Sequence, residues 1–242
     1  MHTFRIVVLA AAVLGAQSVF ATEMMNGTRT EHFDLSSLSK QYPLVKDGSW
    51  PVDWYALYNK LYWEGKGTWS LLPVQLTLNL SVGATLSSNL YPVLFFFRDE
   101  AFAAGPLHGT GFAGFGRTQK GAVNLDAPVA AAPVPLVCSP DFSSGQLAFR
   151  LNEVRYVFSC ELSKDSNISV TLSQGDTTQL VYRGDHVQWK TYWAGDLDRD
   201  GRLDFIDSLT MEHLGCYRVW LSSKAKPGTL LRKTAGTHKD CD

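Results

Sequence analysis

Apolar and polar residues alternate along much of this chain, in a pattern that predicts β-strands. Residues 74–82, VQLTLNLSV, alternate without a break, as in a strand with one buried face. Residues 91–97, YPVLFFF, form a continuous apolar run that ends at a charged Arg-Asp-Glu triplet. We expect this run to be a strand buried on both faces.

The second half of the chain has the pattern of successive hairpins. Turn-forming Gly, Asp, Asn and Ser residues separate short segments rich in β-branched and aromatic residues. Their spacing of roughly ten residues predicts an antiparallel sheet or a small sandwich. The strand-like segments are residues 146–149, 155–161, 168–172, 179–182, 186–193, 217–221 and 230–232.

Helical spacing is confined to short segments. Aromatic and leucine residues recur at helical intervals between Trp54 and Tyr62, after a Ser-Trp-Pro start, so we expect a short helix that ends before Gly65. Its aromatic face suits packing against a sheet better than binding a sugar ring. Shorter helical turns are expected at residues 35–40 and 208–214. The predicted fold class is therefore mainly β (α+β with few short helices).

Two segments of unusual composition interrupt the strands. Residues 105–121 are glycine-rich and contain a formal GxGxxG, but no credible helix follows it, so we expect a turning or contact loop rather than a nucleotide site. Residues 127–137, APVAAAPVPLV, carry three prolines and read equally well as an interdomain spacer or as an edge strand. These features divide the chain into an N-terminal β-rich region, residues 22–126, and a C-terminal β domain, residues 138–242.

The start of the chain has the features of a secretory signal. Arg5 precedes an apolar run, and small residues lead to a cleavage site after Ala21, so residues 1–21 are expected to be a signal peptide. The run is too short for a membrane span, and no transmembrane segment is expected in the mature chain. The predicted location is periplasmic or secreted.

Charge and cysteine usage agree with export. The 22 basic and 23 acidic residues give a net charge of −1 without any basic cluster, which argues against nucleic acid as a partner. All four cysteines lie in the second half, and an exported chain with an even number of them is expected to form disulfides. Because short loops close most easily, we expect Cys138 to pair with Cys160 and Cys216 with Cys241.

The strongest chemical signal is the segment 196–207, DLDRDGRLDFID. Five carboxylates within twelve residues repel one another, and only two arginines offset them, so an ordered loop without a cation would be costly. Ca²⁺ takes oxygen ligands from loop positions 1, 3, 5, 7, 9 and 12, and Gly201 permits the sharp turn between them. The candidate ligands at these positions are Asp196, Asp198, Asp200, the backbone carbonyl of Arg202, Asp204 and Asp207.

Residues 195–207 resemble the aspartate loop of FG-GAP and VCBS-type bacterial extracellular repeats, and are similar to the calcium loops of EF-hands and dockerins. The FG-GAP resemblance implies ligands at positions 1, 3, 5 and 9, a carbonyl at position 7, and a strand on each side. An EF-hand would need flanking helices and usually has glutamate at position 12, where this chain has Asp207. The preceding TYWAG is strand-like, so we expect the strand-flanked form.

Catalytic motifs are not evident. The chain contains neither GxSxG nor HExxH, and its histidines are scattered singly. We therefore expect an exported calcium-binding protein that acts as a non-enzymatic binding or envelope-associated module, with an envelope protein or polysaccharide as partner. The alternative is a calcium-stabilised hydrolase that acts on envelope polymers or polysaccharide.

Overall fold

A computed structural model of the chain describes thirteen segments. The signal-like residues 1–21 and the helical turn expected at 35–40 lie outside them. The described segments contain no helix, and therefore none that could cross a membrane. The described residues are 23–26, 32–33, 54–59, 68–74, 76–79, 84–88, 93–98, 101–112, 122–126, 135–140, 145–185, 188–211 and 214–236.

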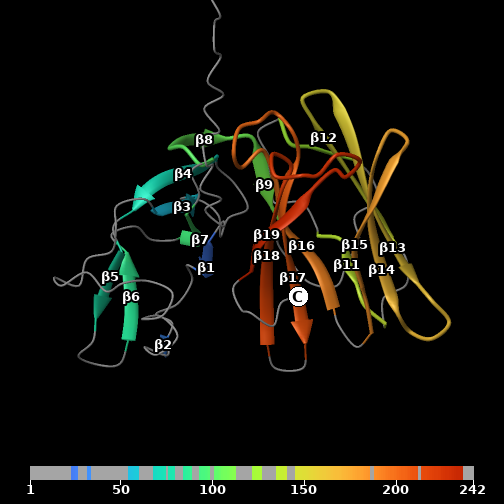
Figure 1. The fold of residues 1–242 in the computed structure, drawn as a ribbon, viewed down its shortest axis with the longest axis horizontal. Coiled ribbons are helices and arrows are strands. Elements are labelled where there is room, and N and C mark those ends of the chain that lie inside the picture. Colours follow the sequence, from blue (N-terminus) through green and yellow to red (C-terminus); the bar gives the residue numbers. More distant parts are fainter. Residues whose placement is uncertain are drawn as a thin grey trace, which may run out of the picture.

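Three larger sheets and one small sheet make up the described structure (Figure 1). All strand pairs are antiparallel except β10 with β12. The N-terminal sheet has the order β1 (Glu23–Asn26), β7 (Val93–Arg98), β3 (Trp54–Tyr58), β4 (Trp69–Val74) and β8 (Gly105–Leu107). The small sheet has the order β2 (His32–Phe33), β6 (Ala84–Ser88) and β5 (Leu76–Asn79).

The other two large sheets come mainly from the C-terminal half. The outer sheet has the order β10 (Ala122–Asn124), β12 (Gln146–Leu151), β13 (Val154–Leu162), β14 (Ile168–Gln174) and β15 (Thr177–Gly184). The central sheet has the order β11 (Val137–Cys138), β16 (Gln188–Gly195), β17 (Asp204–Met211), β18 (Leu214–Leu221) and β19 (Arg232–Gly236), with β9 (Gly109–Gly111) also paired to β16.

The central sheet lies between the N-terminal sheet and the outer sheet (Figure 1). It is buried on both faces, because alternate residues of its strands enter two different apolar clusters. On one face Phe205 packs against Phe158 of the outer sheet, with ring centroids 4.8 Å apart. On the other face its neighbour Ile206 shares a cluster with Leu71 and Phe97 of the N-terminal sheet. The molecule is thus a three-layer β structure, and its mainly β fold agrees with the sequence.

One disulfide joins two of these layers. Cys138 in β11 of the central sheet is bonded to Cys160 in β13 of the outer sheet, which confirms the predicted pair. Cys216 is also disulfide-bonded, and its expected partner Cys241 lies outside the described residues. Leu136, at the end of the proline-rich segment, exchanges hydrogen bonds with the Thr191 side chain and backbone N–H, which fixes β11 to β16.

Two of the short helices that the sequence predicts are strands in the structure, so these two predictions are wrong. Trp54–Tyr58 is the strand β3, which lies between β4 and β7 with Trp54 and Leu57 fully buried. A strand covered on both faces need not alternate, so its apolar residues can fall at helical intervals by coincidence. The described residues of 208–214 are likewise not helical, because 208–211 belong to β17 and Leu214 begins β18.

The glycine-rich segment makes a close backbone contact between two strands. Gly109 of β9 is paired with Gly195, the last residue of β16. A Cβ atom on Gly195 would lie 2.5 Å from Gly109 Cα and still closer to the carbonyl oxygen of His108. Glycine is therefore required here for close approach rather than for nucleotide binding.

We expect Gly195→Ala to lower the free energy of unfolding by about 1–3 kcal/mol or more, since rigid backbone must move to admit the methyl group. Urea denaturation followed by tryptophan fluorescence measures this change. The matched control is Gly215→Ala in β18, where a Cβ atom meets nothing within 4 Å. Alanine there should be neutral or slightly stabilising, and equal losses in the two variants would contradict the packing argument.

Candidate metal centre

The acidic loop joins two adjacent strands of the central sheet. β16 ends at Gly195 and β17 begins at Asp204, so residues 196–203 form the hairpin connection. Gly201 has φ +80° and Arg199 has φ +64°, and both turn the chain back on itself. The loop therefore has strands on both sides, as expected for the strand-flanked form, and not the flanking helices of an EF-hand.

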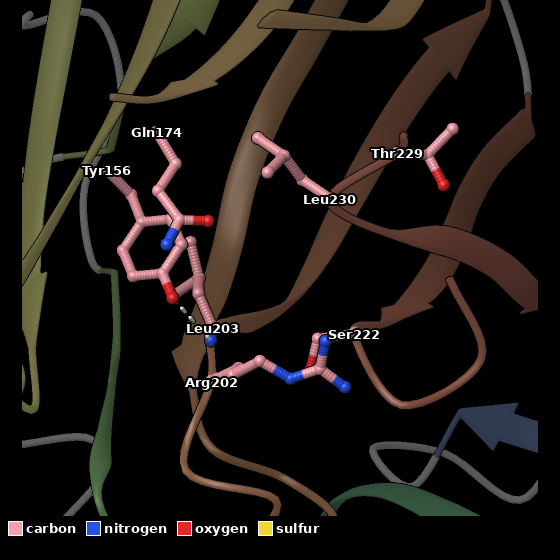
Figure 2. Close-up of a pocket in the computed structure, with 7 residues that line it drawn as sticks. All are labelled: Tyr156, Gln174, Arg202, Leu203, Ser222, Thr229 and Leu230. Atoms are coloured by element: carbon pink, nitrogen blue, oxygen red, sulfur yellow. Dashed lines mark hydrogen bonds between the residues drawn. The ribbon is translucent and has the colours of Figure 1, made fainter. Parts of the chain in front are cut away.

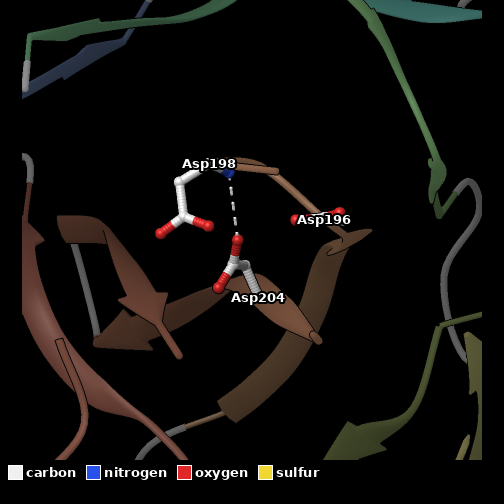
Figure 3. Close-up of side chains that lie close together, drawn as sticks. All are labelled: Asp196, Asp198 and Asp204. Carbon is white, nitrogen blue, oxygen red and sulfur yellow. Dashed lines mark hydrogen bonds between the residues drawn. The ribbon is translucent and has the colours of Figure 1, made fainter. Parts of the chain in front are cut away.

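Three carboxylates of the loop converge. One oxygen from each of Asp196, Asp198 and Asp204 lies within 4.8 Å of the others (Figure 3). Asp204 is fully buried, and the other two are partly buried. The Oδ2 atom of Asp196 accepts a hydrogen bond from the N–H of Gly201 at 3.1 Å, but its Oδ1 atom is buried without a partner. A buried carboxylate oxygen left without a donor fits a site for a cation.

Asp204 is held by donors from both sides of the cluster. Its Oδ2 atom accepts from the N–H groups of Leu197, at 2.7 Å, and Asp198, at 3.3 Å. Its Oδ1 atom accepts from the N–H and hydroxyl of Ser222, at 2.8 and 3.0 Å. Even so, burial raises the pKa of Asp204 well above its ordinary value, and the charge of Asp198 adds to this effect.

The other two carboxyls of the cluster are also biased toward the neutral form. Burial is the main cause that raises the pKa of Asp196 and of Asp198, and the neighbouring charge of Asp200 raises both further. A bound cation would reverse this bias, because it favours the ionised carboxylates. Without a cation, the cluster thus lacks the positive charge that would keep its three carboxylates ionised.

Asp200 and Arg202 lie beside the cluster and contact each other. Oδ2 of Asp200 accepts from Nε and Nη2 of Arg202 at 2.9 and 2.6 Å. The hydroxyl of Ser222 lies between Asp200 and Asp204, at 2.9 to 3.0 Å from their carboxylate oxygens. Position 5 of the pattern therefore lies beside the three converging carboxylates, but the Asp200 side chain is turned toward the side chain of Arg202.

Asp207 lies on the opposite face of β17. Its Oδ1 atom accepts from Nε of Arg218 at 2.9 Å, and its Oδ2 atom accepts from Nε1 of Trp189 at 2.7 Å and from Nη2 of Arg218. Both charged residues are buried between the central and outer sheets. Because strand residues three apart face opposite ways, β17 cannot direct Asp204 and Asp207 to one point. The predicted position-12 residue serves a buried ion pair outside the cluster.

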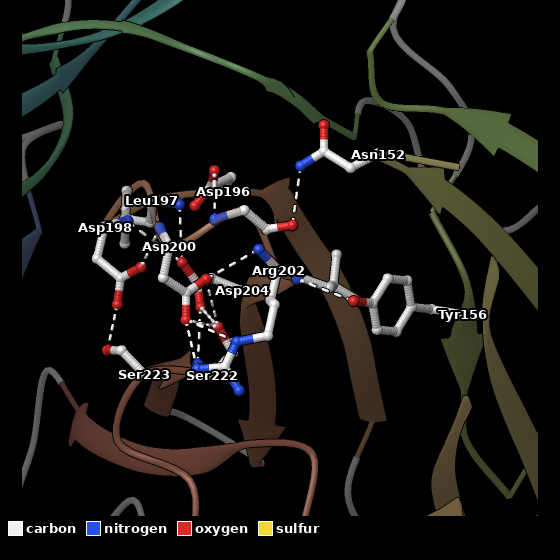
Figure 4. Close-up of polar contacts among 12 residues, drawn as sticks. Asn152, Tyr156, Asp196, Leu197, Asp198, Asp200, Arg202, Asp204, Ser222 and Ser223 are labelled. Carbon is white, nitrogen blue, oxygen red and sulfur yellow. Dashed lines mark hydrogen bonds and ion pairs between the residues drawn. The ribbon is translucent and has the colours of Figure 1, made fainter. Parts of the chain in front are cut away.

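Contacts from all three layers reach the loop, and Figure 4 shows those made by Asn152, Ser222 and Ser223. The Asn152 side chain, from the β12–β13 turn, donates to the carbonyl of Gly201 at 2.8 Å. The carbonyl of His108, between β8 and β9, accepts from the N–H of Asp196 at 2.8 Å. The hydroxyl of Ser223 donates to Asp198.

Ser222, Ser223 and Asn152 were not among the residues predicted for the site. They are distant in sequence from the loop, and their only local signal is that serine and asparagine favour turns.

Searches against protein-family models, curated proteins and solved structures found no match to this chain. The site therefore rests on its own geometry, which is that of an acidic cluster able to bind a metal ion, and no family is identified.

The raised pKa values predict how stability without metal depends on pH. The folded chain holds protons on these carboxyls more tightly than the unfolded chain, whose value is the ordinary 3.8. The stability that these three carboxyls contribute is therefore fully present at low pH and is lost as pH rises through the raised pKa values. In EDTA, we expect the melting temperature to decline as pH rises above the ordinary carboxyl value of 3.8, and Asp196→Asn to reduce the decline. Circular dichroism melts test this, and equal pH profiles for the two proteins would contradict it.

The buried ion pair gives a separate prediction. Arg218→Met leaves the Asp207 carboxylate buried without its charged partner, so we expect a loss of about 3–5 kcal/mol in unfolding free energy. Replacing both residues, by Asp207→Leu with Arg218→Met, should cost less than the single change, because no charge then remains buried. Urea denaturation measures both, and a double variant less stable than Arg218→Met would refute this account.

Proposed function

We propose that this protein is an exported calcium-binding protein whose ion lies among Asp196, Asp198 and Asp204. The proposal rests on three carboxylate oxygens, one from each residue, that lie within 4.8 Å of one another. In addition, Asp196 accepts a hydrogen bond from Gly201 through Oδ2, while its Oδ1 atom is buried without a donor. Such a site attracts a cation both by charge and by an unsatisfied oxygen.

The ligand chemistry supports calcium. The cluster offers carboxylate oxygens alone, which suit a hard cation rather than zinc or copper. Oxygens on opposite sides of Ca²⁺ lie about 5 Å apart, and the three oxygens, all within 4.8 Å of one another, fit within that span. Asp200 and the carbonyl of Arg202, the expected ligands at positions 5 and 7, would supply further oxygens of the shell.

The ion's role follows from the contacts of its loop. The loop is bonded to the turn after β12, to the residue between β8 and β9, and to the segment after β18. Calcium would fix the loop and thereby all three layers at one end of the molecule. We infer a binding or envelope-associated module, without catalysis, whose partner is an envelope protein or polysaccharide.

The location we propose is periplasmic or secreted. The Cys138–Cys160 bond supports this, because structural disulfides persist in oxidising compartments. Calcium sites of low affinity, with Kd near 10⁻⁴ to 10⁻³ M, also suit extracellular modules.

Removal of calcium should destabilise the protein. At a free calcium concentration of about 100 times Kd, the ion adds about 2.7 kcal/mol, which corresponds to roughly 5–10 °C in melting temperature for a domain of this size. We expect this difference between EDTA and excess Ca²⁺ for the unaltered protein, and none for Asp198→Ala. Differential scanning fluorimetry and calorimetric titration with CaCl₂ measure the two effects.

The matched control is Asp176→Ala, at an exposed aspartate in the β14–β15 turn, which should respond to calcium as the unaltered protein does. Equal melting in EDTA and calcium, together with no heat of calcium binding, would overturn the proposed function.

A further inference from the structure

A small polar cavity lies next to the acidic loop and shares residues with it. Its volume is about 100 Å³, room for about three water molecules or for one small functional group. Residues from β13, β14, the acidic loop and the β18–β19 segment surround it (Figure 2). The lining residues are Tyr156, Gln174, Arg202, Leu203, Ser222, Thr229 and Leu230.

Hydrogen-bond donors converge on this cavity. The Tyr156 oxygen accepts from the N–H of Leu203 at 3.4 Å, which leaves its own proton available, and burial raises the pKa of this phenol so that the proton is retained. The side-chain amide of Gln174 points toward the cavity in Figure 2 and makes no hydrogen bond within the described part of the chain. Arg202 adds a guanidinium whose Nη1 is not used on Asp200.

The lining suits an oxyanion. No carboxylate belongs to it among the described residues, and Arg202 is its one charged member there. A guanidinium, a phenol and an amide together present the donors that a carboxylate accepts, and charge-assisted hydrogen bonds of this kind are the stronger ones. Leu203 and Leu230 supply an apolar wall for the carbon that bears the carboxylate, while the hydroxyls of Ser222 and Thr229 suit the hydroxyl groups of a sugar.

Arg202 links the cavity to the acidic cluster. Its Nε and Nη2 atoms are now engaged by Asp200, the residue at loop position 5. A calcium ion that drew Asp200 toward itself would release this guanidinium and also reduce the negative field beside the cavity. A ligand carboxylate could then replace Asp200 on Arg202, so calcium and ligand would each strengthen the binding of the other.

We propose that this cavity binds the carboxylate of a sugar acid in a calcium-dependent manner, an inference that rests on the proposed calcium function. The ring of the sugar would lie at the mouth of the cavity, since 100 Å³ holds the carboxylate and its neighbouring atoms only. The ligand would thus be an acidic polysaccharide, recognised through one of its uronate units.

The test is calorimetric titration of the full chain with galacturonate, in excess CaCl₂ and in EDTA. Binding in calcium that is lost in EDTA is expected. Arg202→Gln should weaken galacturonate binding by about tenfold or more, whereas calcium should still bind, because the backbone carbonyl is kept and Asp200 loses only a competing partner. Gln174→Leu, at a partly exposed strand position, should also weaken galacturonate binding.

The matched control is Arg155→Gln, an exposed arginine next to Tyr156 in sequence but on the other face of β13. This variant should bind galacturonate as the unaltered protein does.

The outcomes separate the two proposals. Calcium binding without galacturonate binding, or galacturonate binding that Arg202→Gln does not change, overturns this inference and leaves the calcium function standing. Equal binding of galactose, or equal binding of N-acetylglycine as a peptide-like carboxylate, overturns the assignment to sugar acids. Absence of calcium binding itself overturns the proposed function.

Discussion

Burial of the Asp204 carboxylate at the start of β17 is the constraint on which the surrounding structure depends. A charge removed from water is costly unless donors or a cation replace its hydration. Here two backbone N–H groups of the loop and two donors of Ser222 do so, and these four contacts oblige the acidic loop and the segment after β18 to meet. The energetic requirement of one side chain thereby sets the positions of two connections that are separate in sequence.

The layered architecture explains why one end of the molecule gathers so many contacts. The two faces of the central sheet are occupied by apolar packing, so polar contacts between the layers are made by the loops at the ends of its strands. The β16–β17 connection is such a place. The outer sheet reaches it through Asn152, and the N-terminal sheet reaches it through His108, the single residue between β8 and β9. Asp207 and Arg218 lie deeper along the same sheet, where a matched pair of charges is sealed between layers.

Local patterns in the sequence were sufficient for much of this picture. The hairpins after residue 145, the Cys138–Cys160 bond and the acidic cluster follow from turn chemistry, loop closure and carboxylate spacing, all of which act over short distances. The strand at Trp54–Tyr58 was mistaken for a helix because burial on both faces removes the alternation that marks a strand. Ser222 and Asn152 could not be found, since contacts between layers leave no periodic trace in either segment.

The contact between Gly109 and Gly195 has a consequence for recognising relatives of this protein. A calcium-type aspartate pattern is short and recurs in unrelated scaffolds, so it cannot define a lineage by itself. Neither Gly109 nor Gly195 can carry a Cβ atom without collision with the facing strand or with Trp193. Homologues that keep the same three layers should therefore retain both glycines together with the aspartates, whereas proteins that merely share the loop need retain only the latter. The two glycines, distant in sequence, therefore mark the three-layer fold more specifically than the aspartates do.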